Sequence, residues 1–174
     1  MTSTDLGRRW ERPLYIFAKP GRVTLAELKR LRAFFGIESG YALDRLHSTF
    51  LPLGETGPEA ITAASAILAD FHAEPFDVTF DHIEGATLKP RKGLRAPGIF
   101  QRALARHFSA RGFALPGYDF GLHLNLDYGN PSDRRAAIAP LHWTVDEILL
   151  IESRYGHIEH GRFPLVARQY ALAL

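Results

Sequence analysis

Two short segments with the same residue order constrain the fold of this chain more than any other feature. His47-Ser48-Thr49-Phe50 and His123-Leu124-Asn125-Leu126 both read histidine, any residue, small hydrogen-bonding residue, bulky apolar residue, and they lie 76 positions apart. Because side chains alternate across a β-strand, the histidine and the residue two positions later project from the same face. Each segment therefore predicts a strand that presents one imidazole and one hydrogen-bonding side chain together.

The second segment shows this alternation most clearly. Leucine occupies positions 122, 124 and 126, and the intervening and following positions are polar: His123, Asn125 and Asp127. An alternation of this kind is typical of a half-buried strand. We expect a hydrophobic core behind this strand and a polar site in front of it.

The remaining elements alternate in a way that predicts one α+β domain over residues 1–174. Further strands are expected over residues 14–18, 46–51, 76–82, 148–153 and 163–172, with Pro164 favouring a sheet edge. Helices are expected over residues 24–36 with Thr24 as N-cap, 60–71, 99–110 and, in short form, 132–139. A helix is the alternative for residues 148–153, where Thr144 and Glu147 have capping-box spacing. Residues 89–97 read as a basic loop. This order gives two related halves, one histidine strand in each, facing each other across a groove.

The basic residues are concentrated in one segment. Between residues 85 and 118 there are seven basic residues and no acidic one, whereas the whole chain has a formal net charge of +2. The seven are Lys89, Arg91, Lys92, Arg95, Arg102, Arg106 and Arg111. A local positive field that ends just before the second histidine segment suits a polyanion guided towards the histidines. The alternative is a solvated face that lacks acids by chance.

Composition excludes several kinds of chemistry. With no cysteine, the chain has no disulfide, no thiolate nucleophile and no cysteine-ligated metal. No apolar stretch is long enough for a signal peptide or a membrane span, so we expect a cytoplasmic protein that does not contact membranes. There is no glycine-rich phosphate loop, which argues against an ATP-driven ligase. His82 and His157 have acidic neighbours but no complete ligand set, so neither a metal nor another cofactor is expected.

Two imidazoles facing each other across a groove suit in-line transfer at phosphorus. A neutral imidazole can take a proton from the attacking water or hydroxyl, and a protonated one can give a proton to the departing oxygen. Histidine suits both tasks because its ordinary pKa near 6.5 makes both forms available. Thr49 and Asn125 can donate hydrogen bonds to the non-bridging oxygens, where charge gathers in the transition state.

With these motifs the chain resembles the two-histidine (2H) phosphoesterase superfamily, specifically proteins related to bacterial 2′-5′ RNA ligase and cyclic nucleotide phosphodiesterase. Its Leu-Tyr-Ile-Phe-Ala-Lys-Pro opening at residue 14, residues 148–156 and residues 161–165 also resemble family strands. The resemblance implies an α+β, bilobal fold with two pseudo-symmetric antiparallel sheets and flanking helices around a central groove. It implies His47 and His123 as catalytic residues, with Thr49 and Asn125 binding the phosphate.

The chain departs from the family pattern in its second motif. Asn125 stands where family members have threonine or serine, and Asp127 and Tyr128 follow where many members have an arginine. Arg134 or Arg135 is a candidate replacement for that arginine. Phe50 and Tyr128 are candidates to stack on a base, although core packing is the alternative for Phe50. The basic residues Lys89, Arg91, Lys92 and Arg95 are further candidates to bind substrate.

The sequence therefore predicts a metal-independent RNA-processing phosphoesterase that acts as a monomer. It would hydrolyse a 2′,3′-cyclic phosphate or catalyse the related 2′-5′ ligation, and its partners would be RNA or nucleotides with such a group. Two alternatives remain open. One is an RNA-binding module with the same groove and little turnover, and the other is a 2H enzyme acting on a small nucleotide phosphoester.

Overall fold

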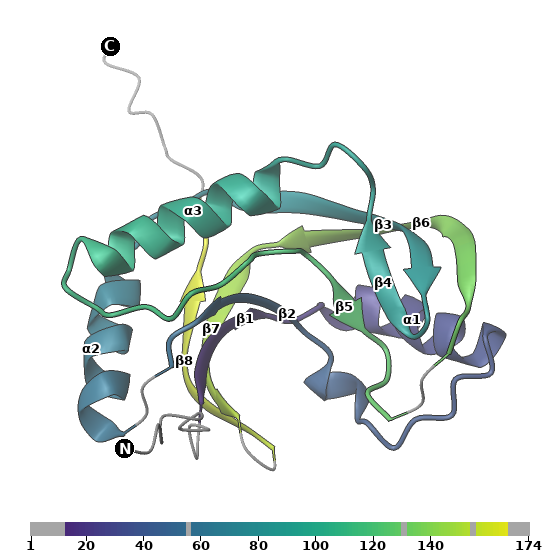
Figure 1. Ribbon diagram of the computed structural model, residues 1–174, viewed down its shortest axis with the longest axis horizontal. Helices are drawn as coiled ribbons and strands as arrows, with labels where there is room; N and C mark the ends of the chain where they lie inside the picture. Colours follow the sequence, from purple (N-terminus) through teal and green to yellow (C-terminus); the bar gives the residue numbers. More distant parts are fainter. Residues whose placement is uncertain (1–12, 55–56, 130–131, 154–155, 167–174) are drawn as a thin grey trace, which may run out of the picture.

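Two four-stranded antiparallel sheets form the framework of the protein (Figure 1). The computed structural model describes residues 13–54, 57–129, 132–153 and 156–166. The first sheet has the order β2-β1-β7-β8 and consists of β1 (Leu14–Ala18), β2 (Ser48–Pro52), β7 (Glu147–Ser153) and β8 (His157–Pro164). The second has the order β5-β4-β3-β6 and consists of β3 (Phe76–Glu84), β4 (Thr87–Pro90), β5 (Leu124–Asn125) and β6 (Arg135–Val145). The bilobal α+β arrangement expected from the sequence is confirmed.

The chain builds the first sheet from both of its ends and the second sheet from its middle. Strand β7 pairs with β1, Ile16 opposite Leu150, so the last strands return to the first lobe. The two lobes therefore do not follow one another along the sequence, as the predicted order of two halves implied, because the middle of the chain forms the second lobe. The apolar run 148–151 is buried on both faces, which places β7 in the sheet interior beside β1.

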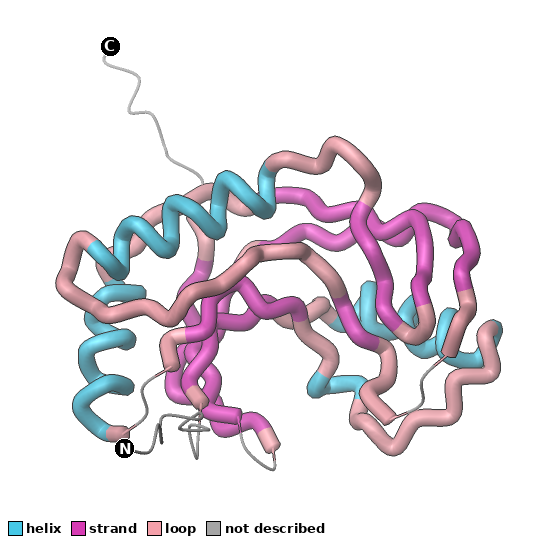
Figure 2. Tube along the Cα trace, viewed as in Figure 1, coloured by secondary structure: helices cyan, strands magenta, loops and turns pink. Residues whose placement is uncertain are grey.

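Three α-helices flank the sheets (Figure 2). Helix α1 (Arg22–Phe34) packs against β6, α2 (Pro58–Ala69) packs against β8, and α3 (Ala96–Ser109) packs against β2 and β3. Helices α2 and α3 lie at one end of the molecule and α1 lies at the other. A short 3-10 helix, η1 (Leu43–Arg45), leads into β2. None of the helices in the part of the chain that the structure describes is long and apolar enough to cross a membrane.

Helix α1 ends where the sequence predicts but begins earlier. Gly21 is its N-cap, and Thr24 lies buried in the first turn without a capping hydrogen bond, so the prediction of Thr24 as N-cap is wrong. At the other end Gly36 has φ +60°, and the Ile37 amide donates to the Arg32 carbonyl at 2.9 Å. This is the αL termination that a glycine after the last turn favours.

Other predicted elements differ in type or extent. Residues 135–139 belong to β6 and not to a helix, because pairing with β3 overrides the helical preference of their alanines. Lys89 and Pro90 end strand β4 and do not belong to a loop. Strand β8 runs from His157 to Pro164, so the strand predicted over residues 163–172 is wrong in its bounds: residues 165 and 166 are not in a strand, and residues 167–172 lie outside the described residues. Pro164 does lie on an edge strand, as predicted.

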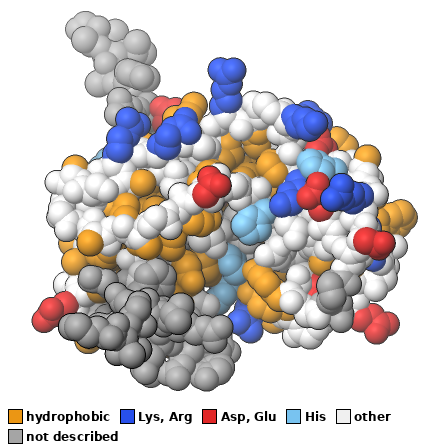
Figure 3. Space-filling model, in the orientation of Figure 1, with side chains coloured by type: hydrophobic (Ala, Val, Ile, Leu, Met, Phe, Trp, Pro, Cys, Tyr) orange, Lys and Arg blue, Asp and Glu red, His pale blue; other side chains and the backbone are white. Residues whose placement is uncertain are grey.

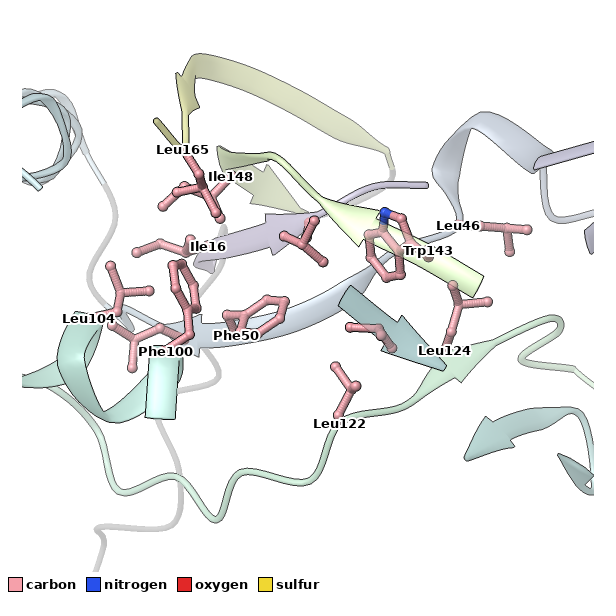
Figure 4. Packing of buried hydrophobic residues seen from close by; sticks show 14 of the residues in the cluster. Ile16, Leu46, Phe50, Phe100, Leu104, Leu122, Leu124, Trp143, Ile148 and Leu165 are labelled. Atoms are coloured by element: carbon pink, nitrogen blue, oxygen red, sulfur yellow. The ribbon is translucent and has the colours of Figure 1, made fainter. Parts of the chain in front are cut away.

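One buried apolar cluster joins the two lobes. Phe50 of β2 packs against Phe100 of α3, with ring centroids 5.2 Å apart (Figure 4). It also packs against Phe120, with centroids 5.5 Å apart. The leucines at 122, 124 and 126 are 8%, 0% and 0% exposed, so the alternation expected of the second histidine segment is confirmed. Both histidine segments therefore have the core behind them, which leaves their polar side chains on the other face.

Candidate active site

Four of the five polar residues of the two motifs lie in one groove between the lobes. His47 directly precedes β2, and His123 directly precedes β5. These histidines line a groove of about 360 Å³ together with Thr49 and Asn125. Figure 3 shows histidine side chains in the hollow at the middle of the molecule. Residues far apart in the sequence are thus brought to one place by the pairing of β1 with β2 and of β4 with β5.

The two catalytic candidates are anchored in the same way. Nδ1 of His47 lies 2.8 Å from the Arg45 carbonyl oxygen, and Nδ1 of His123 lies 2.7 Å from the Gly121 carbonyl oxygen. A carbonyl can only accept, so each Nδ1 carries a proton and donates it to the residue two positions earlier. Each ring therefore keeps Nε2 for a substrate, and each lobe repeats the same device.

A hydrogen bond joins the two motifs directly. The hydroxyl of Ser48, which is 1% exposed, donates to the backbone carbonyl of His123 at 2.7 Å. A polar side chain at this depth needs such a partner. The residue between His47 and Thr49 therefore ties the first motif to the segment that carries His123.

The environment of His47 favours its neutral form. Its ring stacks on Phe17 with centroids 3.8 Å apart and planes 19° from parallel. Burial lowers the pKa of His47 to about 4, against the opposing effect of its hydrogen bond to the Arg45 carbonyl. The nearby positive charges of Lys19 and Arg45 lower this pKa further. His47 is therefore uncharged near neutral pH.

A third histidine lies at the same groove. The ring centroid of His157 lies 5.0 Å from that of His47, and burial lowers the pKa of His157 to about 3. Its neighbour His160 points elsewhere and contacts Glu152 at 2.8 Å. The sequence gives His157 an acidic neighbour but no complete ligand set, and it does not predict its place at the groove, because the β7–β8 pairing that sets it beside Ser153 is not evident from local sequence.

Thr49 and Asn125, the candidates for binding a phosphate, each present a hydrogen-bond donor to the groove. The Thr87 hydroxyl donates to Oδ1 of Asn125 at 2.7 Å, which orients the amide so that Nδ2 has no partner among the residues described. On the opposite lobe, the Thr49 side chain lines the groove while its backbone carbonyl accepts a hydrogen bond from the Tyr118 hydroxyl. Both side chains are therefore available to an anion in the groove.

Asp127, which would repel a phosphate, turns away from the groove. Its carboxylate accepts hydrogen bonds from the Ser39 hydroxyl at 2.6 Å and from the Gly129 amide at 3.3 Å. Arg32, buried in α1, donates to the carbonyls of Leu126 and Tyr41 and so fastens this end of the strand. Asp127 therefore stabilises the local structure through these hydrogen bonds. None of the described residues that line the groove carries a carboxylate.

Three candidate substrate-binding residues lie elsewhere: the expectations for Arg134 and Arg135 are corrected, and for Phe50 the alternative of core packing is confirmed. Arg134 donates to the carbonyls of Gly85 and Phe35, and Arg135 is exposed on β6, so neither lines the groove. Phe50 is fully buried because it alternates with Thr49 along β2, and it cannot stack on a base. None of these three residues replaces a missing substrate contact.

Aromatic residues form the walls of the groove. Tyr128, 56% exposed, lies against Tyr41 with centroids 4.8 Å apart, and Tyr15 stacks on Phe17 at 5.3 Å. All four line the groove. Of these, only Tyr128 was identified from the sequence, since the others carry no motif and reach the site through the sheet and the loop before η1.

The basic residues of the second lobe do not line the groove. Arg91 pairs with Asp81 at 3.4 Å, and Lys92 and Arg95 are exposed between β4 and α3. Lys89 is two residues from Thr87 on β4, so it projects from the same face as the partner of Asn125. Among the four, Lys89 is the one that shares a strand face with a residue bonded to Asn125.

Comparison with known proteins identifies the fold. No family model and no curated protein matches the sequence. The structure of Escherichia coli LigT in apo form is similar with a TM-score of 0.71 at 19% identity, covering 90% of this chain and 98% of that chain. LigT complexed with 3′-AMP gives a TM-score of 0.71 at 20% identity, covering 90% of this chain and 99% of that chain. The structure of a protein of Thermus thermophilus is similar with a TM-score of 0.68 at 16% identity, covering 88% of this chain and 97% of that chain. The chain therefore has the LigT fold over nearly its full length.

Proposed function

We propose that this protein is a phosphodiesterase that opens a 2′,3′-cyclic phosphate, with His47 as general base and His123 as general acid. The observation that carries the proposal is the matched anchoring of the two rings, each holding Nδ1 on a carbonyl two residues earlier and leaving Nε2 towards one groove. Two such nitrogens on opposite sides of a phosphate meet the requirement of in-line displacement.

The assignment of roles follows from the electrostatics of His47. A ring kept neutral by burial can accept a proton but is a poor donor. Nε2 of His47 takes a proton from water as the water oxygen bonds to phosphorus. The bond from phosphorus to one ribose oxygen breaks, and protonated His123 gives its proton to that oxygen. Each such role is typically worth about 10² to 10⁴ in rate.

Thr49 and Asn125 act on the phosphoryl oxygens. The Thr49 hydroxyl and the Asn125 Nδ2 donate from opposite lobes, where negative charge increases in the transition state. If the 5′-hydroxyl of a second RNA attacks in place of water, His47 takes its proton and His123 protonates the departing 3′ oxygen, which leaves a 2′-5′ linkage. Cleavage of that linkage is the reverse reaction, in which the histidines exchange roles. Both directions require only groups of this chain, and both histidines come from one chain, so we expect a monomer to be active.

The ligands of the structural neighbours support a nucleotide substrate. Crystal structures of LigT contain 3′-AMP, phosphate, ATP and NADP⁺. Tyr128 and Tyr41 offer an aromatic surface at the edge of the groove for a base. We propose RNA ending in a cyclic phosphate as the substrate, with Lys89 next to its path.

A small nucleotide phosphoester is the second candidate substrate. The observation that favours it is that Arg91, Lys92 and Arg95 do not line the groove, so the basic segment does not extend the site itself. The two substrates differ in length and not in the reacting group. Their comparison therefore tests substrate class separately from chemistry.

The test is turnover in EDTA of 2′,3′-cyclic AMP and of a short oligonucleotide with the same 3′ end, with products identified by mass. We expect each product to gain the mass of one water, and kcat/KM to be higher for the oligonucleotide. Equal values would favour the small nucleotide. Binding of the oligonucleotide with no turnover would contradict the enzymatic proposal and leave an RNA-binding module.

A further inference from the structure

We propose that the Arg45 guanidinium binds the substrate phosphate in this groove, so that the fixed positive charge of the site comes from the first lobe. The inference rests on the proposed function for the location of the phosphate. It assigns a role to a residue that precedes the first motif and belongs to neither motif. It also accounts for a site in which no described arginine after His123 lines the groove.

Arg45 is the only permanently charged residue among those that line the groove in the described part of the chain. The other lining residues are aromatic, hydroxyl, amide or histidine side chains, and none is acidic: Tyr15, Phe17, Tyr41, His47, Thr49, His123, Asn125, Tyr128, Ser153 and His157. A groove with one fixed cation and no carboxylate attracts an anion. Of these described lining residues, Arg45 is therefore the one candidate for a strong charge-assisted contact with a phosphate.

The guanidinium of Arg45 has no hydrogen-bond or ion-pair partner among the described residues. Its Nε is buried without a hydrogen bond, and the side chain makes no ion pair with any residue of the described ranges. Other arginines of the chain have such partners: Arg32, Arg91, Arg111, Arg134 and Arg162. Because buried donors are nearly always satisfied in folded proteins, an unpaired guanidinium at a groove is open to an anionic ligand.

The position of Arg45 is fixed from two sides. Its guanidinium carbon lies 4.6 Å from the centre of the Tyr41 ring, which holds the planar group by a cation–π contact. Its backbone carbonyl accepts hydrogen bonds from Nδ1 of His47 at 2.8 Å and from the Tyr41 hydroxyl at 3.1 Å. The residue that orients His47 through its backbone therefore presents its side chain to the same groove. A donor that is already in place loses little freedom when it binds phosphate.

The test compares Arg45→Met and Arg45→Lys with Arg30→Met, a matched loss of one charge at an exposed position of α1. Binding of 3′-AMP and of adenosine is measured by calorimetry at low salt, and kinetics are measured with 2′,3′-cyclic AMP. For Arg45→Met we expect affinity for 3′-AMP to fall by about 10- to 100-fold with little change for adenosine, since hydrogen bonds to charged groups have this magnitude. The affinity of Arg45→Lys for 3′-AMP should lie between those of the wild type and Arg45→Met. This variant also tests the proposal if Arg45→Met fails to fold.

The outcomes separate this inference from the proposed function. Loss of 3′-AMP affinity specific to Arg45 supports the inference even if the wild type turns over no cyclic phosphate, a result that would contradict the proposed function alone. Normal turnover with unchanged KM and unchanged 3′-AMP affinity in Arg45→Met would overturn the inference and leave the proposed function intact. Equal weakening of 3′-AMP and adenosine would also overturn it, because a phosphate contact discriminates between them. A wild type that binds no 3′-AMP would contradict it as well.

Discussion

The buried hydroxyl of Ser48 donates a 2.7 Å hydrogen bond to the backbone carbonyl of His123. This bond crosses from the first lobe to the second and joins the segments that carry the two histidines. The chain therefore does not rely on apolar packing alone to set the width of the groove. Ser48 therefore holds the two histidine segments in a fixed position relative to each other.

Replacing this hydroxyl should affect turnover more than substrate binding. In Ser48→Ala the His123 carbonyl loses its partner in a buried place, which should cost about 1–3 kcal/mol of unfolding free energy. We expect kcat to fall about tenfold with a smaller change in KM, because a small misplacement of a reacting group is costly. Thr62→Ala is the control, since that hydroxyl also donates to a backbone carbonyl but lies exposed on α2. Equal effects on kcat and KM would argue against a positioning role.

The orientation of the Asn125 amide should depend on Thr87. The Thr87 hydroxyl donates to Oδ1 at 2.7 Å, so Thr87→Val removes the bond that directs Nδ2 to the groove. We expect kcat to fall by about 3- to 10-fold, in line with one neutral hydrogen bond. Thr87→Ser keeps the donor and should retain activity. If valine and serine give the same rate, the hydroxyl does not orient the amide.

Removing the ring stacked on His47 should raise its pKa. Phe17→Leu takes away an aromatic face 3.8 Å from the imidazole and admits water, so the pKa moves from about 4 towards the ordinary 6.5. The acidic limb of the pH–rate profile should move to higher pH with it. Histidine titration by NMR measures the shift directly. Phe108→Leu, a buried change in α3 at a distance from the groove, should leave the His47 titration unchanged.

Stability should fall as the pH is lowered from about 6.5 to about 4. His47 and His157 have pKa values of about 4 and about 3 when folded, so in this range the unfolded chain binds protons that the folded chain does not. For His47 the loss is on the order of 3 kcal/mol, complete near its folded pKa. Thermal unfolding at several pH values measures it. The double variant His47→Gln with His157→Gln should lose much of this pH dependence, and an unchanged slope would contradict the prediction.

Local sequence was sufficient for the elements that carry the motifs. The alternation at residues 122–127 determines which face of that segment is buried, and burial of one face strongly specifies the register of a strand. The apolar residues of 14–18 predict a buried strand, and they form β1. Resemblance to the 2H phosphoesterases then supplied the bilobal arrangement, and the LigT fold agrees with it. The presence of His47 and His123 in one groove was predictable because each motif specifies its own strand.

The features that local sequence did not predict depend on the pairing of strands that lie far apart in the chain. The alanines at the start of β6 favour a helix locally, and only pairing with β3 makes them a strand. Arg45, Tyr41 and His157 have no motif, and they reach the groove through η1 and the β7–β8 pairing. The same limit applied to Arg134, whose proximity in sequence to the second motif suggested a role that its bonds to two carbonyls exclude.

The most direct test of the two-histidine account is the rate at which His47→Asn and His123→Asn open a 2′,3′-cyclic phosphate in EDTA, relative to the wild type. The account predicts wild-type turnover and a loss of at least about 10²-fold in each single variant, because each ring transfers one proton. It also predicts a double variant little slower than the single ones, since the two groups act as a unit. Activity retained by either single variant would contradict the assignment of His47 and His123 as the catalytic pair.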